Sequence, residues 1–221
     1  MVANANLGFP KIIVTADLMS SITAQLPVLV VHGLWDTEAR IDPLVRGLKA
    51  RGLEHVSSFD LQPNSGRAPI AELARQVKER ADALLAKHGA RQIDLVGFSM
   101  GALAARYFLQ RCGGRDHVRR FISISGPHAG TWTAFALPFA GVREMRPGSA
   151  LLRDLDSDPN PFGDVEVHCL YTSLDLMIVP PVSSVLKNAK SVHRLRVPLH
   201  RFMLHDRQVL DLVAGLLHAT C

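Results

Sequence analysis

A serine between two glycines is the feature of this sequence that could most directly do chemistry. Residues 97–101 read Gly-Phe-Ser-Met-Gly, so the positions two residues either side of Ser99 have no side chain. A backbone with this composition can turn sharply and lift the hydroxyl clear of its surroundings. Because a serine hydroxyl is a poor nucleophile near neutral pH, a base would have to remove its proton. The alternative is a glycine-flanked turn in which the serine is incidental.

An acid and a base that could activate Ser99 follow later in the chain. Asp175 lies among apolar residues just after a predicted strand, where it could orient an imidazole, although a turn or a helix cap would also account for it. His200 and His205 are both candidate bases. We favour His200, because it follows the last predicted strand by three residues and a loop there can reach Ser99. His205 adjoins Asp206, which could equally cap the last helix.

The elements that must position these residues alternate regularly. Short β-branched apolar runs predict strands at 27–31, 55–61, 91–98, 118–125, 165–172 and 191–197. Apolar residues at helical spacing predict helices at 37–51, 69–88, 100–112 and 206–218. This alternation is typical of an α/β fold with right-handed crossovers, in which about six mostly parallel strands are covered by helices on both faces.

Ser99 lies between a predicted strand and a predicted helix. The turn would therefore place its hydroxyl at a helix N-terminus, where free N–H groups and the helix dipole favour developing negative charge. Residues 127–164 depart from the alternation, with five prolines, four glycines and no clear strand. Insertions of this length after a strand commonly form a lid or a wall of a site.

Length and composition favour one soluble domain over residues 1–221, because 48% of the residues are hydrophobic and only 20% are charged. The formal net charge of +5 raises the question of a nucleic-acid partner. The tightest basic group, Arg111, Arg115, Arg119 and Arg120, has no aromatic residues interleaved for base stacking. We therefore expect a solvated basic face and no nucleic-acid binding.

The cysteines and the N-terminus favour a cytoplasmic location. Cys112, Cys169 and Cys221 form no C-x-x-C pair, and an odd count leaves a thiol unpaired. Residues 1–7 carry no basic stretch of the kind that starts a signal peptide. The two long uncharged stretches, 18–35 and 121–142, contain Pro, Gly and hydroxyl residues, which argues against a membrane span. No H-E-x-x-H or Cys/His cluster suggests a metal.

From about Pro27 to the C-terminus the chain resembles the compact bacterial lipases and esterases of the α/β-hydrolase fold. The resemblance rests on Val-Val-His-Gly at 30–33, the 97–101 element, Ser-Gly-Pro-His-Ala-Gly-Thr at 125–131, and the segments 174–181 and 199–204. It implies that Ser99 is the nucleophile, Asp175 the acid and His200 the base, with no cofactor or metal. It further implies that the backbone N–H groups of Leu34 and Met100 stabilise the oxyanion.

Two positions depart from that family's pattern. Phe98 stands where a histidine is most frequent, and Ala102 where a second glycine is frequent. Neither changes the Gly-x-Ser-x-Gly frame, but both affect packing around the serine. The segment 127–130 is also typical of such lipases, and we interpret it as structural, shaping the loop after the fourth strand.

The resemblance implies a serine carboxylic-ester hydrolase that works through an acyl-enzyme intermediate. An acyl thioesterase or an acyltransferase using the same three residues is the alternative. A non-catalytic binding module is disfavoured because no triad member is missing. The uncharged segment 132–142 would form an apolar wall for an acyl ester or lipid, or else pack into the core. A basic surface nearby could assist transient contact with a membrane.

The residues expected to bind such a substrate are Trp35, Phe98, Trp132 and Phe135.

Overall fold

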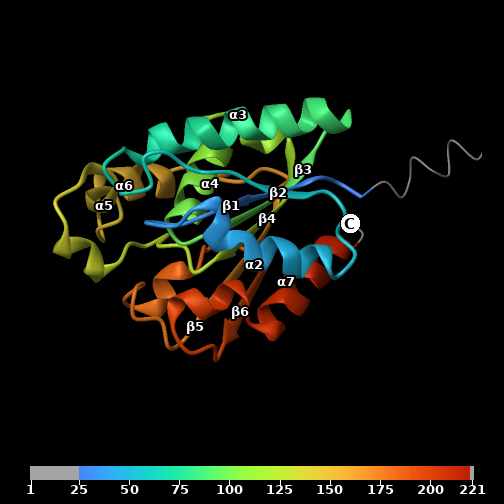
Figure 1. The fold of residues 1–221 in the computed structure, drawn as a ribbon. Coiled ribbons are helices and arrows are strands. Elements are labelled where there is room, and N and C mark those ends of the chain that lie inside the picture. Colours follow the sequence, from blue (N-terminus) through green and yellow to red (C-terminus); the bar gives the residue numbers. More distant parts are fainter. Residues whose placement is uncertain (1–24, 220–221) are drawn as a thin grey trace, which may run out of the picture.

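The core of the protein is a six-stranded parallel sheet, as the sequence predicts. The computed structural model describes residues 25–219, and Figure 1 shows the sheet between two layers of helices. Its strands are β1 (Val28–Val31), β2 (Val56–Ser58), β3 (Ile93–Phe98), β4 (Val118–Ile124), β5 (Glu166–Thr172) and β6 (Ser191–Leu195). All neighbouring pairs are parallel, in the order β2-β1-β3-β4-β5-β6.

Four longer helices cover the sheet, two on each face (Figure 1). They are α2 (Glu38–Lys49), α3 (Ile70–His88), α4 (Met100–Arg111) and α7 (Arg207–His218). Alternate residues of β1 pack against different helical layers, because successive strand residues point to opposite faces of the sheet. Leu29 and Val31 belong to the apolar cluster under α3 and α4. Val28 and Val30 belong to the cluster under α2 and α7.

Capping residues set the helix boundaries within two residues of the predicted ones. The Thr37 side chain accepts a hydrogen bond from the Arg40 N–H at the start of α2. The carboxylate of Asp206 accepts hydrogen bonds from the N–H groups of Gln208 and Val209 at the start of α7. Asp206 is therefore a helix cap, one of the roles considered from the sequence.

The insertion at 127–164 contains no strand and lies beside the carboxyl ends of the strands, at the left of Figure 1. It holds the short 3-10 helix η2 (Trp132–Ala136) and the helices α5 (Ala140–Glu144) and α6 (Ala150–Asp156). Three further 3-10 helices are η1 (Gly114–Asp116), η3 (Pro181–Ser184) and η4 (His200–Leu204).

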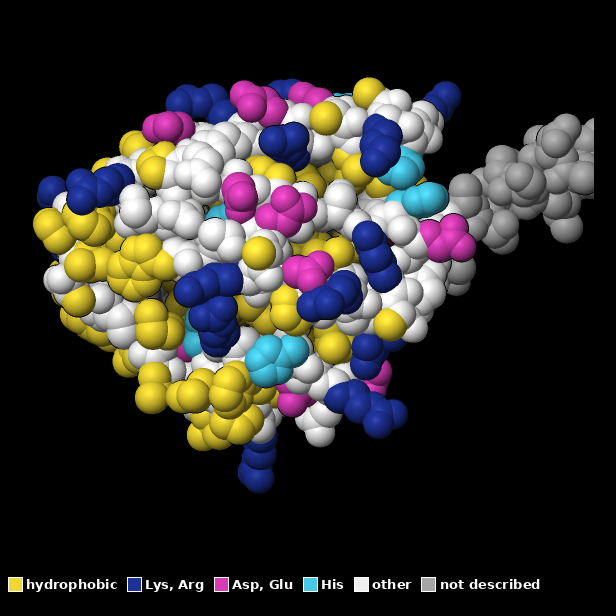
Figure 2. Space-filling view, in the orientation of Figure 1, with side chains coloured by type: hydrophobic (Ala, Val, Ile, Leu, Met, Phe, Trp, Pro, Cys, Tyr) yellow, Lys and Arg dark blue, Asp and Glu magenta, His cyan; other side chains and the backbone are white. Residues whose placement is uncertain are grey.

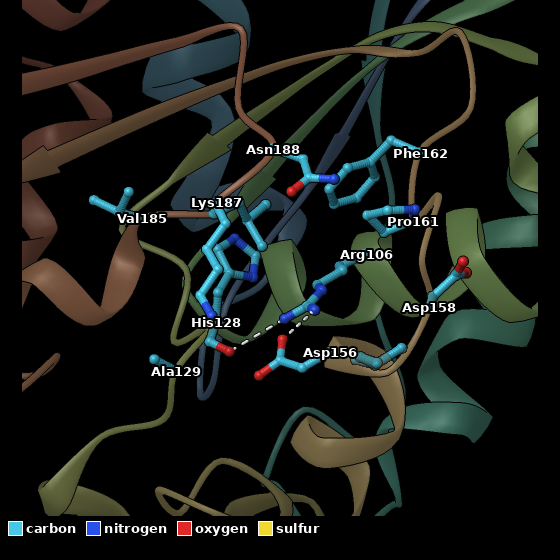
Figure 3. Close-up of a pocket in the computed structure, with 12 residues that line it drawn as sticks. Arg106, His128, Ala129, Asp156, Asp158, Pro161, Phe162, Val185, Lys187 and Asn188 are labelled. Atoms are coloured by element: carbon cyan, nitrogen blue, oxygen red, sulfur yellow. Dashed lines mark hydrogen bonds and ion pairs between the residues drawn. The ribbon is translucent and has the colours of Figure 1, made fainter.

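A buried arginine of α4 joins this insertion to α4 through hydrogen bonds. The guanidinium of Arg106, on α4, donates hydrogen bonds to the carboxylate of Asp156, the side chain of Gln110 and the carbonyl of His128. Arg106, His128 and Asp156 border a cavity of about 120 Å³, shown in Figure 3. The His128 ring is also hydrogen bonded to Ser123 at 2.7 Å. These contacts agree with a structural role for residues 127–130.

The opposite end of the sheet carries a second buried arginine. Arg120 on β4 is 1% exposed and pairs with Glu166 on β5. Its guanidinium also donates hydrogen bonds to the carbonyls of Leu216 and Ala219, which join α7 to the sheet. Hydrogen bonds from Lys190 and Arg120 lower the pKa of Glu166 from 4.5 to about 2.

Some expectations concern residues outside the described part of the chain. Residues 1–7 and Cys221 lie there, as do residues 18–24 of the uncharged stretch 18–35. Cys112 and Cys169 are free thiols within the described part. Between residues 25 and 219, no helix has the length and apolar character needed to cross a bilayer.

Substituting Glu166→Gln tests the Arg120 pair. At pH 7 we expect the free energy of unfolding to fall by about 1.5–3 kcal/mol, because a buried guanidinium loses its charged partner. Since the pKa of Glu166 is lowered in the folded state, its stabilisation is complete above pH 4.5 and is lost as the pH falls toward 2. Urea unfolding from pH 7 to 3 should show the gap to wild type closing with acid.

The matched control for this experiment is Glu79→Gln, a substitution at an exposed carboxylate of α3. It should leave the unfolding free energy within about 0.5 kcal/mol of wild type. A gap between wild type and Glu166→Gln that stays constant with pH would contradict the assignment.

Candidate active site

The strand order creates a crevice where the candidate site lies. β1 lies between β2 and β3 in the sheet. The segments that follow β1 and β3 therefore diverge at the carboxyl edge of the sheet. Parallel α/β sheets bind ligands at such a switch point. Leu34 follows β1 and Ser99 follows β3, which brings both to this crevice.

Ser99 occupies a strained turn between β3 and α4. Its backbone has φ 54° and ψ −126°, a conformation that residues with side chains rarely adopt. Its N–H donates to the Ile124 carbonyl at 2.9 Å, which holds the turn against β4. A Cβ built on Gly101 would lie 2.2 Å from the His32 carbonyl oxygen, and one on Gly97 would lie 2.6 Å from Cα of Ala102. The motif glycines are therefore required by close backbone contacts.

The ring of His200 is fixed by Asp175. Nδ1 of His200 lies 2.7 Å from Oδ2 of Asp175, and the carboxylate is almost wholly buried. Its other oxygen accepts hydrogen bonds from the N–H groups of Met177 and Ile178 at 2.8 and 2.9 Å. Burial alone would raise the pKa of Asp175, but the hydrogen bond to His200, followed by these two backbone hydrogen bonds, outweighs it and the pKa lies below its ordinary value. Asp175 is therefore ionised at neutral pH.

The other ring nitrogen of His200, Nε2, is not engaged by Asp175 and can accept a proton. Nε2 is buried and has no hydrogen-bond partner within the described residues. His200 and Ser99 line the same cavity. Phe98 lies against the ring, with centroids 4.7 Å apart. His205 is exposed on the surface and is not part of that cavity's lining. The structure thus brings His200, rather than His205, to Ser99 and Asp175.

Leu34 and Met100 both lie beside Ser99, where the resemblance places the oxyanion donors. Met100 is the first residue of α4, and the first N–H groups of a helix have no partner inside it. Among the described residues, neither N–H donates a hydrogen bond to another protein group. Leu34 also lines the cavity. Both donors are consequently available to a ligand.

The cavity beside Ser99 measures about 320 Å³ and is mostly apolar. Apolar residues in its wall include Leu34, Ala134, Leu137, Val142, Met145 and Ile178. Trp35 and Phe98, two of the predicted substrate-binding residues, also line it. The structure agrees with an apolar wall formed by part of the insertion.

Trp132 and Phe135 do not line this cavity, which corrects their predicted placement. In a 3-10 helix, residues three apart lie on the same side. Trp132 and Phe135 of η2 stack on each other with ring centroids 5.5 Å apart and are 61% and 52% exposed. Ala134 takes the inward position instead. The hydrophobicity of the segment was visible in the sequence, but the direction of its side chains was not.

Thr131 is a residue that sequence reasoning missed. Its hydroxyl donates to the Met177 carbonyl and accepts from the Val179 N–H, both at 2.8 Å. It therefore joins the insertion to the loop that carries Asp175. A lone threonine after Ala-Gly gives no sequence signal for this contact.

The sequence model of the palmitoyl protein thioesterase family matches residues 27–156. The chain belongs to this family. The matched range includes Leu34 and Ser99, whereas Asp175 and His200 lie beyond it. The palmitoyl-protein thioesterase 3 of Dictyostelium discoideum is 26% identical over 134 residues, which cover 59% of this chain and 45% of that protein. The chain thus matches less than half the length of that relative.

Solved structures of lipases confirm the α/β-hydrolase fold. The mature lipase BlEst2 of Bacillus licheniformis superposes with a TM-score of 0.76 at 15% identity, covering 88% of this chain and 93% of that one. Lipase B of Aspergillus fumigatus superposes with a TM-score of 0.74 at 17% identity, covering 88% of this chain and 53% of that one. Together with the family match, these likenesses show that this member of the palmitoyl protein thioesterase family has a lipase-like α/β-hydrolase fold.

Replacing Thr131 by valine tests its contact with the acid loop. The substitution leaves the Val179 N–H without its partner, so we expect stability to fall by about 1–3 kcal/mol. Asp175 should also be held less firmly, so kcat of hydrolysis should fall more than tenfold while KM changes little. Thermal unfolding and steady-state kinetics measure both effects.

Thr131→Ser keeps the hydroxyl and should recover most of the lost kcat. If the serine variant is as impaired as the valine variant, the hydroxyl does not position the acid loop.

Proposed function

We propose that this protein cleaves acyl thioesters, with Ser99 as the nucleophile, His200 as the base and Asp175 as the acid. The observation that carries the proposal is the 2.7 Å hydrogen bond between His200 and Asp175 beside the apolar cavity that Ser99 also lines. Such an arrangement activates a hydroxyl for attack on an acyl carbonyl.

In the first step Nε2 of His200 takes the proton of the Ser99 hydroxyl as the oxygen attacks the carbonyl carbon. The bond to Asp175 keeps the proton on Nδ1, so Nε2 is the basic nitrogen. The N–H groups of Leu34 and Met100 stabilise the resulting oxyanion. Removing one such donor typically raises the barrier by about 3–4 kcal/mol.

In the second step the tetrahedral intermediate collapses, and the bond from carbon to sulfur breaks. The imidazolium of His200 returns its proton to the departing thiolate, which leaves an acyl group on Ser99. Water then attacks the acyl-enzyme while His200 accepts its proton; the bond from the acyl carbon to the Ser99 oxygen breaks, His200 returns the proton to that oxygen, and the fatty acid departs. No cofactor enters this cycle.

Family membership supports thioesters over the carboxylic esters that the sequence analysis placed first. The apolar wall of the cavity suits an acyl chain, because ligand sites bind mainly through apolar surface with a few polar groups for orientation. Oxygen esters of the same acyl group can undergo the same steps, so we expect slower ester hydrolysis as an accompanying activity.

A fluorophosphonate probe tests whether Ser99 is activated. We expect the wild-type protein to be labelled and the Ser99→Ala variant to lose labelling and at least 1,000-fold in hydrolysis of an acyl thioester. Ser173→Ala is the control, because this serine also follows a strand of the sheet, β5, which β4 separates from β3. Labelling that survives in Ser99→Ala would refute the mechanism.

Narrowing the cavity tests where the acyl chain binds. Ala136 is exposed and lines the cavity, so tryptophan at this position should obstruct it without disturbing the core. We expect Ala136→Trp to lower kcat/KM for dodecanoyl and hexadecanoyl thioesters at least tenfold more than for an acetyl thioester.

Ala140→Trp serves as the control for this series, because Ala140 is also exposed in the insertion but does not line the cavity. A chain-length profile that Ala136→Trp leaves unchanged would place the acyl chain elsewhere.

A further inference from the structure

Large apolar side chains are exposed on the segments that also contribute residues to the cavity at Ser99. Six of them form what we call the mouth surface: Trp35, Trp132, Phe135, Leu176, Met177 and Phe202, each at least 41% exposed. They come from the segments after β1, β4 and β5 and from η4. Figure 2 shows hydrophobic side chains gathered at the left and lower left, over the end of the molecule that holds these segments.

The mouth surface is continuous with the cavity. Trp35 and Met177 belong both to the surface and to the cavity wall. Thr133 and Ala134, which lie between the exposed Trp132 and Phe135 in η2, also line the cavity. A group that covers the mouth surface would therefore lie directly over the entrance to the site.

Cationic side chains accompany the exposed apolar ones. The Arg146 guanidinium lies 4.8 Å from the centre of the Phe135 ring. The exposed Arg40 donates a hydrogen bond to the carbonyl of Trp35, and the exposed Arg201 adjoins Phe202. These arginines give the edge of the mouth surface positive charge.

Three carboxylates of these segments are buried or hydrogen bonded, and the exposed Asp154 and Asp156 of α6 pair with Arg111 and Arg106. Asp36 and Asp175 are buried, and Glu144 accepts a hydrogen bond from the Ile70 N–H at 2.6 Å. The exposed Glu38 lies at the start of α2, where its N–H bonds to Asp60 beyond β2. Glu38 lies three residues from Trp35 along the chain, so the mouth surface also has negative charge near it on the β2 side.

We propose that the mouth surface docks on an anionic lipid bilayer, so that an acyl group passes from the bilayer into the cavity without crossing water. Exposed Trp, Phe and Leu beside basic residues are typical of surfaces that lie in the bilayer interface. A second copy of the chain fits less well, because its arginines would approach those of the first. The passage of an acyl group rests on the proposed function, whereas the docking itself does not.

Sedimentation with vesicles tests the docking. We expect the wild-type protein to bind vesicles of phosphatidylcholine with 30% phosphatidylserine at least tenfold more strongly than phosphatidylcholine alone, and to lose this preference in 0.5 M salt. The double substitution Trp132→Ser with Leu176→Ser should weaken binding roughly tenfold or more, because two interfacial anchors are removed.

Val192→Ser provides the matched control, because Val192 is an exposed apolar residue on β6 and not part of the mouth surface. This variant should bind vesicles like wild type. Circular dichroism and thermal unfolding check that the exposed substitutions leave the fold intact.

Ser99→Ala separates the two proposals, because it should bind vesicles normally even though it cannot hydrolyse thioesters. Equal loss of binding in Val192→Ser and the double variant, or no vesicle binding by wild type, would overturn the docking proposal. So would sedimentation equilibrium showing a wild-type dimer that the double variant does not form.

Discussion

The close contact between the turn at Ser99 and the end of β1 is the constraint on which the site depends. Gly101 lies so near the His32 carbonyl that no side chain fits between the start of α4 and β1. This approach brings the segment after β1 beside Ser99 and places the N–H groups of Leu34 and Met100 on the same crevice. The backbone strain at Ser99 is maintained because β4 and the first turn of α4 hold the turn from both sides.

The sequence predicted the regular part of this arrangement well. β-branched runs and helical spacing gave six strands and four long helices, because these patterns reflect which face of each element is buried. The choice of His200 over His205 followed from distance along the chain to the end of a strand, and the geometry places His200 against Asp175. Residues whose positions depend on an element with a strong local pattern are therefore predictable from the sequence.

Residues whose positions are decided by tertiary contacts are not predictable in this way. The direction of Trp132 and Phe135 depends on the phase of a five-residue 3-10 helix, which hydrogen bonds from Thr131 to the acid loop help to fix. The burial of Arg106 depends on partners 22 and 50 residues away. A local sequence pattern contains no information about such pairings, so these features became visible only in the structure.

The position of β6 at the edge of the sheet has a consequence for how the protein loses activity. This strand pairs with β5 alone, its side chains are half-buried or exposed, and the segment that follows it carries His200. Edge elements with few buried contacts open by local unfolding more readily than central strands. Opening of β6 would withdraw the histidine while β1, β3 and β4 keep the serine turn intact. Under the proposed function, local opening of this one edge strand would therefore be enough to inactivate the site while the rest of the sheet stays folded.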